Sequence, residues 1–81
     1  MKKGCIVMER KIKLTQDKVD HFIAITSQCD FDIDIAYNRY VVDAKSFLGV
    51  YSMDFSKVLT VRYDGYDAKL EELLKANEIA C

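Results

Sequence analysis

Proline is absent from the sequence and glycine is rare: the 81 residues include no proline and three glycines. Disordered chains are typically rich in these residues and poor in apolar ones, whereas 51% of this chain is apolar and 31% is charged. The composition therefore predicts a folded, soluble protein. Its length favours a single domain, residues 1–81, with a core that is only marginally sufficient.

An excess of one charge is also missing. The 12 Lys and Arg residues nearly balance the 13 Asp and Glu residues, which leaves a net charge of −1. Because there is no basic field, we expect no nucleic-acid or membrane partner. The early apolar run, Cys5–Met8, is shorter than a secretory signal or a membrane span requires. We therefore expect a cytoplasmic protein.

Cysteine is scarce, and its spacing carries no metal or disulfide motif. Cys5, Cys29 and Cys81 are odd in number and include no CxxC pair, unlike the even, dense sets of secreted disulfide frameworks. We expect reduced thiols, with Cys29 packed as a small apolar residue. A zinc site built from these cysteines and His21 would lack the paired ligand spacing of structural zinc sites. No metal and no other cofactor is expected.

Apolar and polar residues alternate in several segments, which is the pattern of strands with one buried face. These segments are residues 6–14, 31–37, 40–43 and 58–63, and the first alternates most cleanly over its last five positions. Asn38-Arg39 is expected to turn the chain between the second and third strands, although glycine would suit the place of Arg39 better.

Three further segments predict helices. The first follows Thr15 or Asp17, either of which can cap it; the second runs from Ser46 to about Met53; the third follows the cap residue Asp67. The apolar positions that recur at helical spacing in the first and third segments are Val19, Phe22, Ile23, Thr26, Leu70, Leu73 and Leu74.

The expected order of elements is β-α-β-β-α-β-α. The alternation in the strands implies a sheet with one solvated face, so the helices must cover the other face. We predict an α+β open-faced sandwich, with a four-stranded antiparallel sheet covered on one face by three helices. Glu71 and Lys75 are expected to form an exposed i, i+4 pair on the last helix.

The run from SQCDFDIDIAYN through DAKSFLGVYSMDFSK to VLTVRYDG resembles HPr, the phosphocarrier protein of the bacterial sugar phosphotransferase system. Proteins of this family share the predicted order of elements and the pattern K-S-apolar-apolar-G-V-x-S, which Lys45–Ser52 matches. The resemblance covers roughly residues 12–79. It implies an HPr-like fold and a role other than that of an enzyme.

The segment ahead of the first helix departs from the family pattern G-I-H-A-R-P, whose histidine accepts the phosphoryl group. Aligned without a gap, Thr15 takes the place of the histidine and Asp17 that of the arginine. If the first strand instead extends to Leu14, most of this loop is deleted. In both alignments the nucleophile is missing, and the Asp17 carboxylate would repel an incoming phosphoryl group.

His21, the only histidine, is the one imidazole that could replace the missing acceptor. It lies about a turn beyond the start of the first helix, whereas the free amides that stabilise a phosphohistidine belong to the first turn. A phosphate ester on Thr15 would be too stable to pass on readily. Phosphoryl transfer through His21 or another non-standard residue is thus the alternative hypothesis.

Ser46 matches the serine that, by the resemblance, an ATP-dependent HPr kinase phosphorylates to regulate carbon catabolism. A phosphate here would face the positive end of the helix. Serine is also a preferred N-cap whether or not it is modified. Ser46 is therefore both a predicted cap and a candidate regulatory site.

The short second helix carries more apolar residues than one face can bury. Val50 and Met53 share the face that can enter the core, so Phe47, Leu48 and Tyr51 are expected to lie partly outward. In the family this outward patch docks enzyme I, the sugar permeases and the kinase. Two further residues, Phe55 and His21, are expected to extend it. Alternatively, Phe47 shields a short core.

The function expected from these residues is that of an HPr-like regulatory or adaptor module without histidine phosphocarrier activity. Its expected partners are proteins: enzyme I, HPr kinase, a permease domain or a catabolite regulator. Two alternatives remain open. One is a phosphoryl carrier that uses a non-standard residue, and the other is an interaction domain unrelated to sugar transport.

Overall fold

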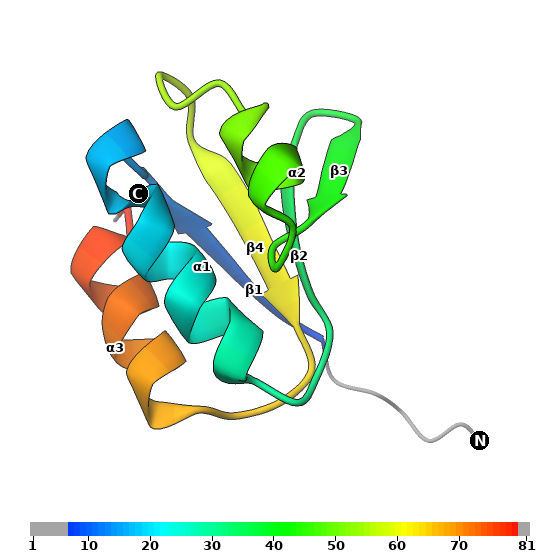
Figure 1. The fold of residues 1–81 in the computed structure, drawn as a ribbon, viewed down its shortest axis with the longest axis vertical. Helices are drawn as coiled ribbons and strands as arrows, with labels where there is room; N and C mark the ends of the chain where they lie inside the picture. Colours follow the sequence, from blue (N-terminus) through cyan, green and yellow to red (C-terminus); the bar gives the residue numbers. More distant parts are fainter. Residues whose placement is uncertain (1–6, 80–81) are drawn as a thin grey trace.

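The computed structural model describes residues 7–79. Within this range, four antiparallel strands form one sheet in the order β1-β4-β2-β3, and three α-helices cover one face of it (Figure 1). The architecture confirms the predicted α+β open-faced sandwich and is consistent with an HPr-like fold. The elements are β1 (Met8–Ile12), the 3-10 turn η1 (Gln16–Lys18), α1 (Val19–Gln28), β2 (Ile33–Tyr37), β3 (Tyr40–Asp43), α2 (Phe47–Tyr51), β4 (Leu59–Tyr63) and α3 (Ala68–Asn77).

The strand order explains why the helices share a face. β1 and β2 are both antiparallel to β4, so they run parallel to each other, and α1 makes the crossover between them. In the same way, β3 and β4 flank β2, and α2 makes the crossover between these two parallel strands. α1 lies between α2 and α3 on the sheet (Figure 1).

The bounds of three strands differ from the prediction, and β2 begins at Ile33 rather than at residue 31. β1 ends at Ile12 because Leu14 leaves the sheet and is fully buried in the core. β4 begins at Leu59, and Val58 before it is 42% exposed. The connection between β1 and η1 therefore consists of residues 13–15.

The core lies between the sheet and the helices. Its fully buried side chains include Tyr63, Phe22, Ile12, Leu14, Ile33, Ile35, Leu59, Leu70, Leu74, Val19, Val50 and Val61. Cys29 is also buried, as predicted, and burial raises the pKa of its thiol. Cys5 and Cys81 lie outside the described residues.

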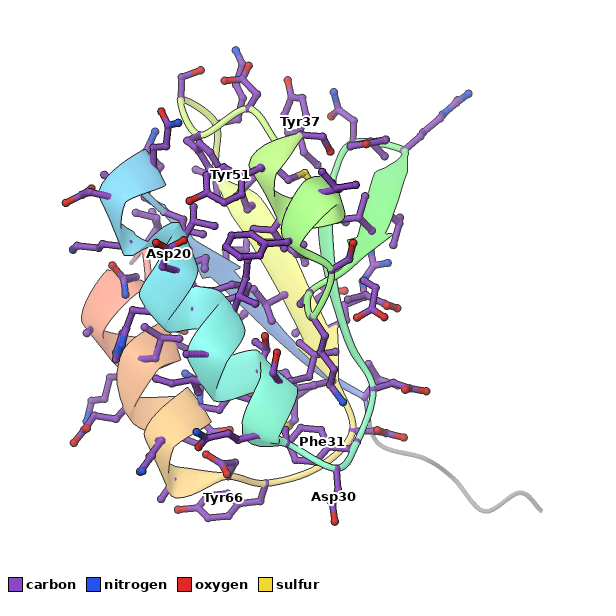
Figure 2. All side chains as sticks on the ribbon, viewed as in Figure 1. Asp20, Asp30, Phe31, Tyr37, Tyr51 and Tyr66 are labelled. Atoms are coloured by element: carbon purple, nitrogen blue, oxygen red, sulfur yellow. The ribbon has the colours of Figure 1, made fainter. Side chains whose placement is uncertain are left out.

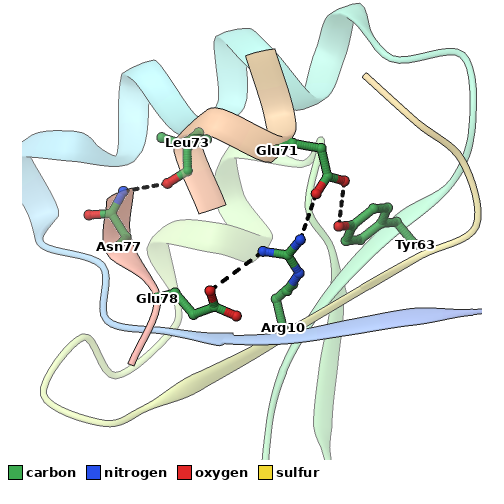
Figure 3. A network of polar contacts seen from close by, with 6 residues as sticks. All are labelled: Arg10, Tyr63, Glu71, Leu73, Asn77 and Glu78. Atoms are coloured by element: carbon green, nitrogen blue, oxygen red, sulfur yellow. Dashed lines mark hydrogen bonds and ion pairs between the residues drawn. The ribbon is translucent and has the colours of Figure 1, made fainter. Parts of the chain in front are cut away.

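A polar network joins β1 and β4 to α3 (Figure 3). The Arg10 guanidinium donates to the Glu71 carboxylate over 2.7 Å, and the Tyr63 hydroxyl donates to the same carboxylate over 2.6 Å. Arg10 also lies 3.6 Å from the Glu78 carboxylate. The predicted exposed pair of Glu71 with Lys75 is wrong, because Glu71 turns toward the sheet, where a cation and a phenol reach it.

Two turns each depend on one residue. Among the residues that the structure describes, only Asn38 has a positive φ, 55°, so Arg39 occupies ordinary backbone space and glycine is not needed there. At Gly65, a Cβ atom would lie 2.3 Å from the Phe31 ring, so glycine is required for the close approach of the turn to that ring.

Within residues 7–79, no helix is long and apolar enough to cross a membrane. No group of three His, Cys, Asp or Glu side chains in the same range could hold a metal ion.

Candidate functional site

α2 is held close to the sheet by what it buries. Val50 is fully buried and Met53 is 5% exposed, as the helical spacing predicted. Gly49 lies directly over β3: a Cβ atom on it would be 3.1 Å from the Val42 Cβ. Because this side of the helix has no side chain, α2 packs tightly on β3, and its opposite side faces solvent.

The segment before α2 is pinned to α1. The buried Thr26 hydroxyl donates to the Ala44 carbonyl over 2.9 Å, and the Lys45 ammonium donates to the Cys29 carbonyl over the same distance. These bonds fix where α2 begins relative to α1.

Ser46 is the N-cap of α2, as predicted. Its backbone is extended, and its hydroxyl oxygen accepts a hydrogen bond from the Gly49 amide over 3.2 Å. The Ser46 side chain is otherwise exposed to solvent. The cap explains why so short a helix begins here.

Three large apolar side chains of α2 stay outside the core. Phe47 is 53% exposed, Leu48 is 87% exposed and Tyr51 is 38% exposed; we call these three residues the α2 surface. The Phe47 and Tyr51 rings stack with centroids 5.2 Å apart and an angle of 21° between their planes. Phe47 does not belong to the buried core, which argues against the view that it mainly shields it.

The α2 surface is tied to α1 through Tyr51 (Figure 2). The Tyr51 hydroxyl donates to Asp20 Oδ1 over 2.8 Å, and this hydrogen bond raises the pKa of the phenol. At neutral pH the phenol therefore remains protonated and donates to Asp20. The sequence alone does not indicate this role of Asp20, because the contact joins residues 31 positions apart.

Tyr40 is a second neighbour that sequence reasoning missed. It is 49% exposed on β3, and its hydroxyl lies 2.6 Å from the Ser52 hydroxyl, which itself donates to the Gly49 carbonyl. The Tyr40 ring thus borders α2 on the side away from α1. Strand alternation could have indicated this position, because Tyr40 and Val42 are two residues apart and therefore share one face of β3.

The structure does not bring His21 to the α2 surface. Asp20 faces α2, and the next residue along an α-helix is turned by about 100°. His21 accordingly lines an open hollow of about 690 Å³ between α1 and α3, together with Ala24, Leu73 and Ala76. Phe55 is half-buried and packs against the core, so it contributes only part of its ring to the surface.

Thr15 and Asp17 are both exposed at the entrance to α1. Thr15 is the N-cap of η1, but its side chain makes no capping hydrogen bond, and Lys18 occupies the cap position of α1. Interaction with the Thr15 hydroxyl lowers the pKa of the Asp17 carboxyl. An ionised carboxylate therefore stands where the family resemblance places an arginine.

A loop after α2 adds charges of both signs beside the α2 surface. Asp54 Oδ1 accepts hydrogen bonds from the Ser56 amide and hydroxyl over 3.0 and 2.6 Å, and the bond from the hydroxyl lowers the pKa of the Asp54 carboxyl. The Lys13 ammonium donates to the Ser56 carbonyl over 2.6 Å, which links this loop to the entrance of α1.

Comparison of the chain with protein-family models, with curated proteins and with solved structures gave no match in any of the three. The function proposed below therefore rests on the residues and their geometry.

Proposed function

We propose that this chain is an HPr-like adaptor module that binds another protein through the α2 surface and has no histidine phosphocarrier activity. The observation that supports this most is the exposure of Phe47, Leu48 and Tyr51 on a helix whose other side is fixed to the core. Contiguous exposed apolar side chains on a small domain are typical of protein-binding sites, and aromatic residues dominate binding energy there.

The entrance to α1 supports the second half of the proposal. An acceptor in a phosphoryl relay must be nucleophilic and must release the group again. The Thr15 hydroxyl would form a stable ester, and the ionised Asp17 repels an anionic donor. Neither residue supplies the chemistry of an imidazole.

His21 offers little support for the carrier alternative. It is exposed in the hollow between α1 and α3 and is the third residue of α1, which follows η1 directly. The backbone amides of Lys18 and Val19 at this helix start already donate to the carbonyls of Thr15 and Gln16, so they are not free to bind a phosphate on His21.

By the resemblance, the partner belongs to the bacterial phosphotransferase network: enzyme I, HPr kinase, a permease domain or a catabolite regulator. The proposal places the chain in the cytoplasm, where these proteins meet. Apolar and aromatic contacts from the α2 surface would provide the affinity, and the charges of Asp20 and Asp54 at its rim would select among partners.

Regulation at Ser46 is part of the same proposal. Its hydroxyl is exposed at the edge of the α2 surface, and a phosphoryl group would add about −1.5 to −2 charges there. Incubation with an HPr-type kinase and ATP should add one phosphoryl group by intact mass, and Ser46→Ala should prevent it. An unmodified wild-type protein would leave Ser46 as a cap only.

Binding is tested by calorimetry with purified enzyme I and HPr kinase, using two matched variants. Leu48→Asp changes the most exposed residue of the α2 surface, and Tyr66→Asp changes a residue that is 76% exposed at the opposite end of the molecule (Figure 2). We expect Leu48→Asp to weaken binding by about tenfold or more and Tyr66→Asp to leave it unchanged. Equal effects of the two variants would refute the α2 surface as the binding site.

Phosphoryl transfer is tested separately with enzyme I and phosphoenolpyruvate. We expect no acid-labile phosphoryl group on the chain. Labelling that disappears in His21→Ala would establish the carrier alternative. If the chain binds no phosphotransferase component and is captured from its own cells only with unrelated proteins, the interaction-domain alternative holds instead.

A further inference from the structure

The two edge strands of the sheet, β1 and β3, differ in whether another segment of the chain covers them. At the β1 edge, the Ile79 amide donates to the Lys11 carbonyl over 2.9 Å, and the Lys13 amide donates to the Asn77 carbonyl over 3.0 Å. The last described residues, 77–79, therefore cover the end of this edge, and Ile12 forms an isolated bridge with Glu78. Covering an edge in this way prevents another strand from adding to it.

The β3 edge has no such cover within residues 7–79: β3 pairs only with β2. The Ala44 amide donates to the Ile33 carbonyl, so alternate residues before Ala44, namely Val42 and Tyr40, direct their backbone groups toward β2. The N–H and C=O groups of Val41 consequently point away from the sheet. The strand contains no proline, lysine or bulge that would protect it.

The residues along this edge are complementary to themselves. Arg39, the second residue of the turn between β2 and β3, lies two positions before Val41, and Asp43, the last residue of β3, lies two positions after it. When two identical strands pair antiparallel about Val41, the N–H of each Val41 faces the C=O of the other, and each Arg39 faces the partner's Asp43. A shift of either strand by two residues would place a charged residue opposite valine, so the charges select this register.

We propose that two copies of the chain associate through β3 in this register, forming a symmetric dimer with one continuous sheet. The proposal goes beyond the function proposed above and does not depend on it. The occupant is a second copy because the edge offers opposite charges equally spaced from its centre, which is the requirement of a two-fold interface.

The charges of the isolated chain are consistent with a missing partner. Within the described residues, neither Arg39 nor Asp43 takes part in an ion pair, although Asp43 Oδ1 accepts a hydrogen bond from the Lys45 amide over 2.9 Å. Asp43 is paired directly across the ladder with Asp34, and like charges in that position repel. A guanidinium from the partner would offset this repulsion.

Exposed apolar side chains border the same edge. Val41 and Tyr40 are each 49% exposed, on opposite faces of β3. Pairing would bury part of both, and the net charge of −1 leaves little general repulsion between copies. Edge pairing thus adds apolar burial to the main-chain hydrogen bonds.

Antiparallel edge pairing keeps the covered face of both sheets on one side, because the two-fold axis is perpendicular to the sheet. Two four-stranded sheets would give eight strands, with both α2 surfaces on the same side of the assembly. The dimer would therefore present two copies of any site on α2, and a partner with two binding sites would bind it more tightly than a single copy.

Sedimentation equilibrium of the full chain over a range of concentrations, with a reducing agent present, tests the proposal. We expect a reversible monomer–dimer equilibrium. Arg39→Glu and Asp43→Arg should each raise the dimer dissociation constant by about tenfold or more, since each replaces two opposite-charge pairs with two like-charge pairs. An equimolar mixture of the two variants should form a heterodimer, because both of its pairs are opposite in charge.

Two further variants keep the test decisive. Lys57→Glu makes the same charge change as Arg39→Glu on an exposed loop residue and should leave the dissociation constant unchanged. Val41→Pro removes the outward N–H and should abolish the dimer, and far-UV circular dichroism should show an intact fold. A wild-type chain that stays monomeric at all concentrations, a dimer insensitive to Val41→Pro, or charge variants that fail to pair with each other would overturn the proposal.

Discussion

Tyr63→Phe probes the network that attaches α3 to the sheet. The Tyr63 hydroxyl donates to the Glu71 carboxylate over 2.6 Å, and the tyrosine is 2% exposed. Substitution by phenylalanine keeps the ring, including its contact with Phe31 at 6.2 Å between centroids, and removes only the hydroxyl. Glu71, which is half-buried, retains its bond to Arg10, so its carboxylate is not left without a partner.

The effect on stability should depend on pH. At neutral pH a hydrogen bond to a charged group contributes about 1.5–3 kcal/mol, and we expect a loss near 1.5 kcal/mol because Arg10 still satisfies Glu71. Burial raises the pKa of Tyr63 from 10.0 to about 12, and the hydrogen bond to the Glu71 carboxylate is the second cause of this shift. The raised pKa contributes fully to the stability of the fold at pH values below the pKa of tyrosine in the unfolded chain, 10.0. This contribution is lost as the pH rises toward the pKa in the folded chain, about 12. By about pH 11 the loss reaches about 1.4 kcal/mol.

The assay is urea unfolding followed by far-UV circular dichroism, for both proteins, at several pH values from neutral to about pH 11. Other groups titrate in both proteins alike, so their contributions cancel in the difference. We expect the wild type to be about 1.5 kcal/mol more stable at neutral pH and the two free energies of unfolding to converge near pH 11. A difference that does not change with pH would refute the raised pKa of Tyr63 and the reasoning behind it.

Two other substitutions test how α2 is positioned. Thr26→Val should lower the free energy of unfolding by about 1–3 kcal/mol in urea titrations, because the buried Ala44 carbonyl loses its donor; an effect below about 0.5 kcal/mol would contradict this role. In Gly49→Ala the new methyl group meets the Val42 Cβ at 3.1 Å, which offsets the gain of about 1 kcal/mol that alanine brings over glycine inside a helix, so we expect no net stabilisation. The double variant Gly49→Ala/Val42→Ala should be more stable than the sum of the two single effects predicts, because the smaller side chain relieves the clash. Strictly additive effects of the two substitutions would contradict the clash.

Much of the fold could be predicted because its signals are local. The alternation that predicts β2, the serine and aspartate caps of α2 and α3, and the spacing of Val50 and Met53 each need only a few neighbouring residues. These patterns give the order and the faces of the elements, and so the open-faced sandwich.

What local patterns miss depends on contacts between distant segments. Glu71 has a lysine at i+4, yet it bonds to Arg10, 61 positions away, because strand order places β1 under α3. Likewise, the sequence shows that His21 follows Asp20 on the same helix, but it does not show which of the two side chains faces α2. The packing of the three helices on one face of the sheet decides that. The prediction that Tyr51 lies on the α2 surface was therefore correct, whereas the prediction that His21 extends this surface was wrong.

The α2 surface and the entrance to α1 are separate features of the described residues. The α2 surface depends on Gly49, Thr26 and the Ser46 cap, whereas the acceptor would require an imidazole at the entrance to α1. The absence of an acceptor at Thr15 and Asp17 therefore leaves the packing of α2 unaffected. Under the proposed function, the module binds the proteins of a relay without taking part in the transfer.

The most direct test of this account is a nuclear magnetic resonance titration of the isotopically labelled chain with enzyme I in the presence of phosphoenolpyruvate. The account predicts amide shifts concentrated on residues 46–52 and on Asp20, with no phosphoryl group gained by the chain. Shifts centred on the hollow between α1 and α3, together with a phosphorylated His21, would contradict it, as would a spectrum that enzyme I leaves unchanged.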